Sequence, residues 1–480
     1  MRDFTAMTFT AMTIDGQDAE APARIPVRNP ADGQVFAVVP DAGAAELDAA
    51  VAAATRAFPA WAATPWAERQ ARVARIGAAI AAEAGALAAL LTREQGKPLA
   101  QAQFEVHAAA QWCGAIASME LPVAVVEDSV EHRVETHRVP IGVVGAISPW
   151  NFPILLSVWK IAPAILAGNT LVLKPSPFTP LCVLRIGALL REILPPGVVN
   201  VVTGGDGLGP LMTGHPGFGK ISFTGSTATG RRVMASAAPT LKRLTLELGG
   251  NDPAIVFPDV DVRATAEQIF WSAFTNSGQI CVATKRAYVH ADVYDDFLAA
   301  LRAVAEAVPM GDGAQAGIAL GPLQNRAQYE RVQGLVADCR ASGARVIEAG
   351  RAPEGPGYFI PVTLIDDPDE ASRIVQEEQF GPVLPLIRFT DEDDVIARAN
   401  AGEYGLAATI WTGDEARALR LAGRIEAGSV WINEALALSP FAAFGGHKQS
   451  GLGQENGIGG LEEFTNPKTV TIRRLATQAA

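Results

Sequence analysis

Cysteine and histidine are scarce in this sequence. Its 480 residues include 4 cysteines and 6 histidines. The cysteines form no CxxC pair, and the histidines show neither ligand spacing nor an HExxH motif. Zinc sites and disulfide frameworks require such residues at short, regular intervals. The sequence therefore predicts neither a metal site nor a disulfide framework, and any cysteine with a function is expected to act as a free thiol.

Long apolar runs and an excess of basic residues are absent as well. No stretch reaches the ~18 uninterrupted apolar residues of a membrane span, since the best one, 154–166, is broken by Lys160 and Pro163. The N-terminal region has no apolar core of signal-peptide length. Asp and Glu (51) outnumber Lys and Arg (39), whereas nucleic acids and anionic membranes attract basic surfaces. We therefore expect a cytoplasmic protein with neither nucleic acid nor membrane as a partner.

Apolar residues, by contrast, are plentiful. They make up 49% of the chain against 19% charged residues, so a large core can form. The length suggests about three domains of roughly 150 residues. The N-terminal segment, to about residue 20, is expected to be a loose arm, and the alanine-rich residues 44–112 are predicted to form two or three helices.

Between 141 and 257, short apolar runs alternate with helical stretches. The expected strands are 141–147, 170–174, 198–202, 220–224 and 244–248, and the expected helices lie near 154–167, 180–193, 207–213 and 226–237. This alternation predicts a parallel sheet covered on both faces, with ligands at the carboxyl ends of its strands. A second α/β series spans about 250–438, and its expected strands are 287–290, 345–349, 362–365, 383–389, 407–411 and 429–433. Two half-polar strands, 131–139 and 469–475, are expected to pair in one small sheet within the molecule or between subunits.

One cysteine stands apart from the other three. Cys281 ends the small polar turn Asn276-Ser277-Gly278-Gln279-Ile280-Cys281, and Gly278 allows backbone to lie close to the thiol. The ordinary alternative is a buried structural cysteine. That alternative fits Cys113, Cys182 and Cys339, which sit in helical apolar patterns, better than it fits Cys281.

Three further motifs carry polar groups that chemistry could use. Glu247 closes an apolar strand, where burial would raise its pKa towards that of a general base, although a helix cap or a lysine partner would also explain it. Asn151 lies in the rigid turn PWNFP, where its amide could donate to an oxyanion. The stretch FTGSTATG (223–230) could bring backbone N–H groups to a pyrophosphate, but no strict GxGxxG is present.

Taken together, these motifs resemble those of the aldehyde dehydrogenase superfamily over nearly the whole chain. The matching segments are PWNFP, LVLKPSPFTP, FTGSTATG, LELGGND, NSGQICVATKR, EEQFGPV and FGGHKQSGLGQENG. The resemblance implies an α/β, aldehyde dehydrogenase-like fold with a Rossmann-type parallel cofactor domain (1–121 and 141–248), an α/β catalytic domain (249–445) and a small β oligomerisation element (122–140 and 460–480). It also implies a homodimer or homotetramer.

The same resemblance implies a role for each matching residue. Cys281 would be the nucleophile that forms a thiohemiacetal and then a thioester with a small-molecule aldehyde. Asn151 would hold the oxyanion, Glu247 would activate the water that hydrolyses the thioester, and Glu455 matches a second carboxylate that relays protons. NAD, with NADP possible, is the implied cofactor. The implied cofactor contacts are Ile147, Ser148, Pro149, Trp150, Lys174, Ser176, Pro177, Gly205, Gly209, Phe223, Thr224, Gly225, Ser226, Leu248, Glu378 and Phe380.

Two departures from the family pattern qualify these expectations. Pro177 stands where the family often has a glutamate that binds the adenosine ribose, so weakened discrimination between NAD and NADP is predicted. Ile280 and Val282 flank the thiol and favour an apolar or aromatic aldehyde, while Lys285 and Arg286 are assigned to the next strand rather than to a substrate clamp.

Three alternatives remain beside a hydrolytic aldehyde dehydrogenase. A CoA-acylating dehydrogenase would generally lack the carboxylate at Glu247, and a nitrilase-type thiol hydrolase would need no dinucleotide cleft. An inactive binding relative would have no need for Cys281, Glu247 and Asn151 together. The sequence does not name the aldehyde.

Overall fold

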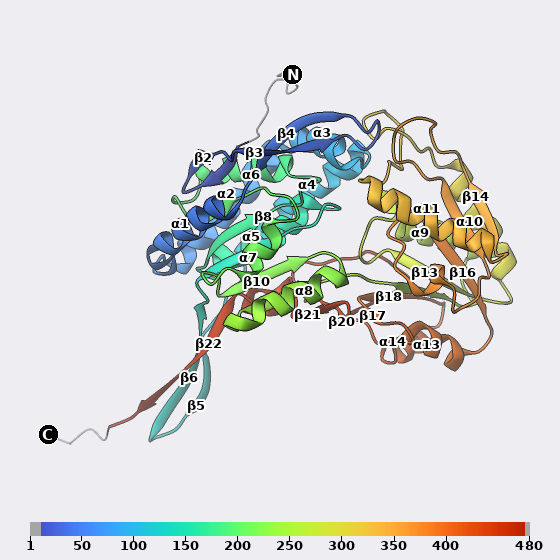
Figure 1. Ribbon diagram of the computed structural model, residues 1–480. Coiled ribbons are helices and arrows are strands. Elements are labelled where there is room, and N and C mark those ends of the chain that lie inside the picture. The colour runs from blue at the N-terminus through green and yellow to red at the C-terminus, as the bar shows by residue number, and fades with distance from the viewer. Residues whose placement is uncertain (1–10, 476–480) are drawn as a thin grey trace.

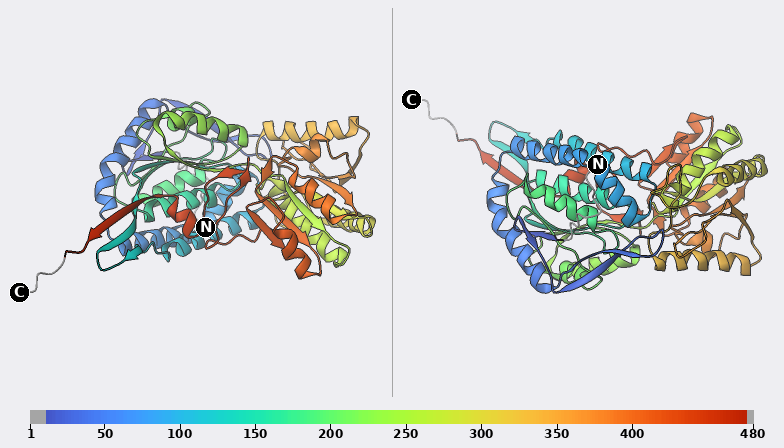
Figure 2. Two further views of the ribbon diagram at one scale, coloured as in Figure 1. Left: turned by 90° about the horizontal axis from the view of Figure 1, so that it is seen from below. Right: turned by 90° about the horizontal axis from the view of Figure 1, so that it is seen from above.

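The computed structural model describes residues 11–475 of the chain. Within this range, most strands belong to two large sheets that lie beside one another, each with its own helices (Figure 1). A narrow arm projects from the side of the first sheet, as the two further views also show, and it is built from β5 (Ala124–Asp128), β6 (His132–Pro140) and β22 (Thr465–Arg473) (Figure 2). The predicted α/β class is confirmed.

The first sheet has the strand order β2-β1-β9-β8-β7-β10-β11-β21 among the described residues. Its five central strands run parallel, as predicted: β9 (Val199–Val201), β8 (Thr170–Lys174), β7 (Val143–Ile147), β10 (Lys220–Thr224) and β11 (Arg243–Glu247). The predicted helices follow them as α5 (Pro153–Leu166), α6 (Leu181–Arg191), α7 (Leu208–Gly214) and α8 (Thr227–Ala237). Every residue of β7, β8, β9 and β10 is buried, because helices cover both faces.

Two N-terminal predictions need correction. Part of the expected loose arm is a hairpin, β1 (Met12–Ile14) and β2 (Gln17–Ala19), which extends the first sheet antiparallel to β9 and buries Met12 fully; residues 1–10 lie outside the described residues. The alanine-rich region forms four helices instead of two or three. They are α1 (Ala44–Ala62), α2 (Trp66–Ala82), α3 (Ala84–Gln95) and α4 (Leu99–Ala117), and they follow the β3 (Ala23–Arg28) and β4 (Val35–Asp41) hairpin. Pro65 and Pro98 directly precede α2 and α4, and they mark breaks that apolar periodicity alone did not reveal.

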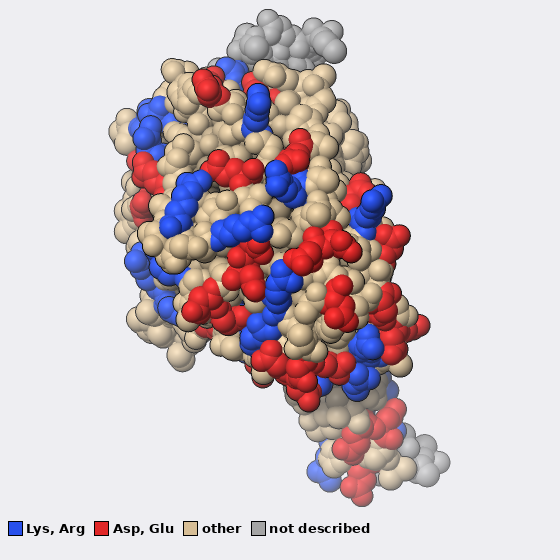
Figure 3. Space-filling view, turned by 90° about the vertical axis from the view of Figure 1, so that its right-hand side faces the viewer, with Lys and Arg blue, Asp and Glu red and all other residues tan. Residues whose placement is uncertain are grey.

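The second sheet has the order β14-β15-β16-β13-β12-β18-β19 in the described chain. It confirms the predicted strands β13 (Thr284–His290), β14 (Arg345–Ala349), β15 (Val362–Asp366), β16 (Val383–Phe389), β18 (Ala407–Trp411) and β19 (Ser429–Ile432), and it adds β12 (Asp252–Val256), which the sequence analysis missed. Its helices are α9 (Val262–Phe274), α10 (Tyr294–Ala307), α11 (Arg326–Ala341), α12 (Arg373–Gln376), α13 (Glu392–Asn400) and α14 (Glu415–Ala422). On the outer face of this half, acidic and basic side chains are interspersed (Figure 3).

The two half-polar strands pair with each other, as predicted. β6 (His132–Pro140) and β22 (Thr465–Arg473) run antiparallel, with Thr136 opposite Thr469, and β5 (Ala124–Asp128) joins them as an unpredicted third strand. β5 is exposed along its whole length. In the described chain, no single helix is long and apolar enough to span a membrane; α2 and α3 pass that test only as a pair bent by 72°.

The C-terminal segment returns to the first sheet and completes it. β21 (Gly451–Leu452) pairs antiparallel with the end of β11, with Gly451 opposite Glu247. Just before it, β20 (His447–Lys448) pairs with β17 (Tyr404–Gly405), and α15 (Gly457–Glu462) follows. This return places Glu455 and Glu247 on the wall of one cavity although they are 208 positions apart in the chain.

Candidate active site

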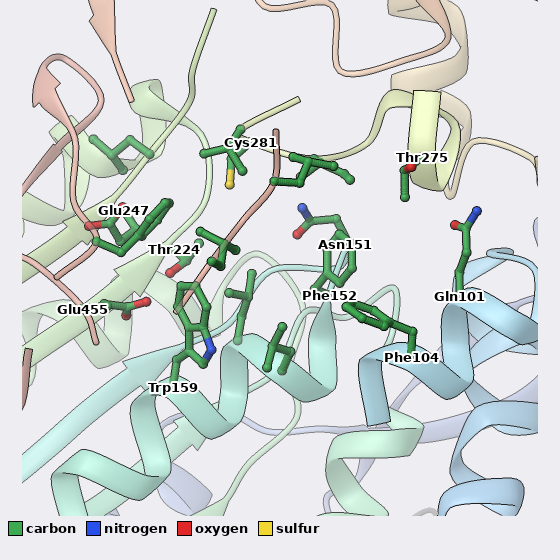
Figure 4. Close-up of a pocket in the computed structure, with 18 of the residues that line it drawn as sticks. Gln101, Phe104, Asn151, Phe152, Trp159, Thr224, Glu247, Thr275, Cys281 and Glu455 are labelled. Carbon is green, nitrogen blue, oxygen red and sulfur yellow. The ribbon is translucent and has the colours of Figure 1, made fainter. Parts of the chain in front are cut away.

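All four predicted catalytic residues line one cavity of about 420 Å³. Cys281 follows the short helical turn η3 (Thr275–Gly278), Glu247 ends β11, Asn151 lies in the turn between β7 and α5, and Glu455 precedes α15. Figure 4 shows the thiol of Cys281 and the side chains of Asn151 and Glu247 around the same space. Four segments far apart in the sequence therefore build a single site.

The nucleophile loop has an unusual backbone. Asn276, Ser277 and Gly278 all have positive φ angles, of 53°, 54° and 77°, which favour glycine and occasionally asparagine. A Cβ atom at Gly278 would lie 2.3 Å from the carbonyl oxygen of Gly381. The close approach that requires Gly278 is thus to Gly381, which corrects the expectation that it concerned the thiol. Room for the carbonyl oxygen of Cys281 comes from Gly250, where a Cβ would lie 2.6 Å away.

Cys281 differs from the other three cysteines in its exposure. Cys113, Cys182 and Cys339 are buried on α4, α6 and α11, whereas Cys281 is partly exposed. The structural interpretation is therefore confirmed for those three. Although the residue is partly exposed, desolvation raises the pKa of its thiol to about 12, and nearby Lys285 lowers that pKa. The thiol accordingly requires a nearby base or cation to become nucleophilic.

Glu247 is a buried carboxylate without a hydrogen-bond partner. It is 3% exposed, and neither carboxylate oxygen has a partner among the described residues. It is neither a helix cap nor half of an ion pair, which removes the two alternatives considered from the sequence. Burial, and then repulsion from Glu455, raise the pKa of Glu247 well above its ordinary value. Such a group can take up a proton near neutral pH.

Glu455 is held by a buried lysine. Its Oε1 atom lies 2.6 Å from Nζ of Lys160, which also donates to Oγ1 of Thr224 at 2.8 Å. The Oε2 atom is buried and has no partner among the described residues. Glu455 therefore presents one uncommitted carboxylate oxygen in the same cavity as Glu247.

Asn151 keeps part of its donor capacity free. Its Nδ2 donates one hydrogen bond, at 3.1 Å, to the carbonyl oxygen of Gln279, just before the nucleophile. An amide nitrogen carries two N–H groups, so the second remains for a ligand in the cavity. The side chain is 4% exposed and tightly placed, as the two flanking prolines predicted.

A second cavity, of about 410 Å³, reaches Cys281 from another side. Its walls contain eight of the predicted cofactor contacts: Pro149, Trp150, Thr224, Gly225, Ser226, Leu248, Glu378 and Phe380. Ser226 is the N-cap of α8, so backbone N–H groups of the first helical turn face this groove. Glu378 accepts a hydrogen bond from the Gly250 N–H at 3.1 Å, and Phe380 packs edge-on against Trp150.

The remaining eight predicted contacts do not line this groove. They are Ile147, Ser148, Lys174, Ser176, Pro177, Gly205, Gly209 and Phe223. Most lie at the same carboxyl edge of the first sheet, where Ile147 is in register with both Lys174 and Phe223. Lys174 is 5% exposed, and within the described chain its ammonium makes one long hydrogen bond, 3.5 Å, to the Pro175 carbonyl. A buried cation with spare donors at the carboxyl edge of a parallel sheet fits a dinucleotide.

Several cavity residues were not predicted. Gln328, Arg331 and Tyr404 line the second cavity, while Gln101 and Phe104 of α4 line the first. Other unpredicted residues of the first cavity are Leu155, Leu156, Trp159 and Phe444. They come from helix faces and a loop, where an apolar residue in the sequence does not reveal whether it faces the core or a cavity.

Comparison with known proteins gives the same picture. The model of the aldehyde dehydrogenase family matches residues 17–470. The chain belongs to the aldehyde dehydrogenase family. A probable aldehyde dehydrogenase of a Pseudomonas species is 44% identical over 97% of this chain and 95% of its own length. The NADP(+) succinate-semialdehyde dehydrogenase GabD of Escherichia coli K12 is 41% identical over 96% of each chain.

A solved aldehyde dehydrogenase structure agrees with these sequence comparisons. The NAD+ complex of an aldehyde dehydrogenase from Bacillus cereus superposes with a TM-score of 0.94 at 36% identity, over 97% of this chain and 96% of the other. As a member of the aldehyde dehydrogenase family, this chain is therefore an oxidoreductase that converts an aldehyde to its acid with NAD(P)+. The predicted family, fold and reaction are confirmed.

Proposed function

We propose that the reaction runs through covalent intermediates on Cys281 and ends in hydrolysis. The main support for this proposal is that one cavity is lined by Cys281, Asn151 and Glu247. The Cys281 thiolate attacks the aldehyde carbon and gives a thiohemiacetal, whose oxyanion accepts hydrogen bonds from Asn151 Nδ2 and the Cys281 backbone N–H. NAD(P)+, when bound beside Cys281, would supply the hydride acceptor that oxidises this thiohemiacetal to a thioester on Cys281.

Glu247 then acts as the general base. Its carboxylate takes a proton from the water that attacks the thioester carbonyl, the carbon–sulfur bond breaks, and the acid and the Cys281 thiolate are released. The two unpartnered oxygens of Glu247 support this role, since a structural carboxylate would be paired. They also favour water over coenzyme A as the acceptor. Glu455 has one free oxygen and an ion pair with Lys160, so it can accept the proton from Glu247 and relay it, which regenerates the base.

Cofactor binding is proposed along the carboxyl edge of the first sheet. Gly225 and Ser226 at the start of α8 would hold the pyrophosphate, Lys174 the adenosine ribose and Glu378 the nicotinamide ribose. Because Pro177 has no carboxylate, it neither binds a 2′-hydroxyl nor repels a 2′-phosphate. We therefore keep the prediction that NAD and NADP are weakly discriminated.

We further propose that the aldehyde is uncharged and apolar. Within the described chain, the lining of the first cavity includes no Lys or Arg, and its two ionisable carboxylates, Glu247 and Glu455, would repel an anion. The walls are otherwise mainly aliphatic and aromatic. They include Phe104, Phe152, Leu155, Leu156, Trp159, Ile280, Val282, Leu436, Leu438 and Phe444. Burying a substrate carboxylate against such walls is costly.

The polar wall residues are already engaged with the protein. Gln101 accepts a hydrogen bond from the Asn276 N–H at 3.0 Å and donates to the Ala319 carbonyl at 2.9 Å. Thr275 donates to the Trp271 carbonyl at 2.6 Å. These groups therefore offer little recognition to a polar substrate tail, which agrees with the apolar mouth predicted at Ile280 and Val282.

Assembly and domain roles also stay proposals. The arm of β5, β6 and β22 carries exposed valines, Val126 at 68% and Val130 at 90%, and we propose that it joins copies of the chain into a dimer or tetramer. The division into cofactor (1–121, 141–248), catalytic (249–445) and oligomerisation (122–140, 460–480) parts remains a prediction, and residues 476–480 lie outside the described residues. The cytoplasmic location remains a prediction as well.

The proposed role of Cys281 has a direct test. Cys281→Ala should abolish aldehyde-dependent NADH formation, while NADH fluorescence titration should show nearly unchanged cofactor binding. Retained turnover would overturn the assignment. Loss of cofactor binding and turnover together would indicate that the substitution disturbs the fold instead of the chemistry.

A further inference from the structure

A fully buried ion pair lies behind the proposed oxyanion donor. Lys97 follows α3, Glu105 lies within α4, and both side chains are 0% exposed, with Nζ and Oε2 2.5 Å apart. In the described chain, neither residue is among those lining the two cavities. A buried ion pair is weak support for stability, because desolvation of both charges offsets much of their attraction. Its contacts therefore suggest another role.

The two side chains of the pair form hydrogen bonds at opposite ends of the turn that contains Asn151. Lys97 Nζ donates to the backbone carbonyl of Asn151 at 2.8 Å and lies 3.7 Å from the ring centre of Phe152. Glu105 Oε1 accepts hydrogen bonds from the backbone N–H groups of Ile154 at 2.9 Å and Leu155 at 3.2 Å, in the first turn of α5. The ammonium of Lys97 thus binds the carbonyl of Asn151, and the carboxylate of Glu105 binds the start of the helix that follows Asn151.

The same helix also holds the nucleophile loop. Gln101, one turn before Glu105 on α4, accepts a hydrogen bond from the backbone N–H of Asn276 at 3.0 Å. The side chain of Asn276 in turn donates to the Asn151 carbonyl at 3.2 Å. The Gln279 carbonyl in turn accepts a hydrogen bond from Asn151 Nδ2 at 3.1 Å. Loop and turn are therefore tied to each other and to one face of α4.

We propose that the Lys97–Glu105 pair is a positioning element that holds Asn151 in register with Cys281. This proposal rests on the oxyanion role proposed above for Asn151. An oxyanion donor works only when it is preorganised at the developing charge, and misplacement by about 1 Å can cost about 100-fold in rate. Neither Lys97 nor Glu105 touches the reacting atoms; both act through the Asn151 backbone.

The test is a mutant cycle on the rate of hydride transfer. The Lys97→Met/Glu105→Gln variant removes both charges, so that no unpaired buried charge remains, and glutamine can still accept from Ile154. We expect single-turnover NADH formation to slow about 10- to 100-fold, with little change in KM. Asn151→Ala alone should cost about 100- to 1000-fold. Adding Asn151→Ala to the double variant should cost much less than it does in the wild type, because the pair acts through Asn151.

Glu94 offers a matched control. It is 0% exposed and accepts hydrogen bonds from the N–H groups of Leu181 and Cys182 at the start of α6, just as Glu105 does at the start of α5. Glu94→Gln should lower the melting temperature and leave the single-turnover rate unchanged. If the Lys97/Glu105 double variant does not fold, Glu105→Gln replaces it in the cycle.

The outcomes separate two failures. A double variant with the wild-type rate, or effects that multiply fully with those of Asn151→Ala, would overturn the positioning role and leave the proposed function intact. An Asn151→Ala enzyme with the wild-type rate would overturn the oxyanion role itself, and the positioning role with it.

Discussion

Two cavities of nearly equal size, about 420 and 410 Å³, meet at Cys281, and their walls differ in chemistry. The first is built from aliphatic and aromatic side chains of α4, α5 and the segment that includes Leu436 and Leu438. The second has glycines, a helix N-terminus, Glu378 and Arg331. One thiol can therefore face an apolar reactant on one side and a charged dinucleotide on the other. The boundary residues Asn151, Leu156, Thr224, Leu248 and Cys281 line both cavities.

The two cavities differ in which polar groups face the open space. In the apolar cavity, the uncommitted groups are the ones to which we assign chemistry: the oxygens of Glu247, Oε2 of Glu455 and one N–H of Asn151. In the second cavity, backbone amides and ionisable side chains face the space together. Breaking either arrangement should change one half of the reaction and spare the other.

The largest effect on turnover is expected from Glu247, the proposed general base in the apolar cavity. Glu247→Gln should lower kcat about 100- to 10,000-fold, because glutamine cannot accept the proton of the attacking water. A rapid-mixing experiment should still show a burst of NADH, since the cofactor side is untouched. The wild-type enzyme under the same conditions is the reference. Normal steady-state turnover would contradict the role of Glu247, and loss of the burst would place its role before hydride transfer.

A cation at the apolar wall should alter substrate choice. Leu438 is partly buried on the first cavity, so Leu438→Arg can be accommodated near the mouth. The ratio of kcat/KM for a carboxylated aldehyde over an apolar one should rise about 10- to 100-fold, because the guanidinium can pair with the carboxylate. Leu438→Met, which conserves volume, is the control and should leave the ratio close to that of the wild type. An unchanged ratio in the arginine variant would place the substrate tail elsewhere.

On the cofactor side, a new carboxylate should restore discrimination. Pro177→Glu should lower kcat/KM for NADP+ about 10-fold by repulsion of the 2′-phosphate and leave kcat/KM for NAD+ equal or higher. Pro177→Gln provides a side chain of the same size without the charge and should discriminate less. A wild-type enzyme that already prefers NAD+ very strongly would contradict the role given to Pro177.

The smallest expected effect is a pH dependence of cofactor binding. Burial lowers the pKa of Lys174 to about 8, so its amine is charged below that pH and neutral above it. Affinity for NADP+ should therefore fall a few-fold between about pH 7 and 9, and less for NAD+. Fluorescence titration measures both. In Lys174→Met, the affinity for NADP+ should no longer fall over this pH range. An equal fall of affinity in that variant would show that another group titrates.

The two cavities were not equally predictable from the sequence. On the cofactor side, Gly225 and Ser226 lie in the turn that follows β10, Glu378 follows α12, and all three residues do line the second cavity. Cys281, Glu247, Asn151 and Glu455 were likewise anticipated and do share the first. Local motifs indicated most of these residues, whereas Glu378 and Glu455 came only from the family resemblance.

The apolar side depended on tertiary structure. Phe104 and Trp159 belong to helices whose apolar residues could face either the core or a cavity, and only packing decides. The unpaired state of Glu247 was equally invisible, because the nearby Lys160 of α5 pairs instead with Glu455, which the return of β21 beside β11 brings from the other end of the chain. The β1–β2 hairpin was missed for the same reason, since Met12 is buried only against elements distant in sequence.

The preference of Cys281 for an apolar, uncharged aldehyde can be measured as the wild-type kcat/KM for hexanal and for succinic semialdehyde, at saturating cofactor and neutral pH. These two aldehydes have the same number of non-hydrogen atoms. We expect a preference for hexanal of about 100-fold or more, since the carboxylate would be desolvated among apolar walls and beside Glu247 and Glu455. Equal values, or a preference for succinic semialdehyde, would contradict it.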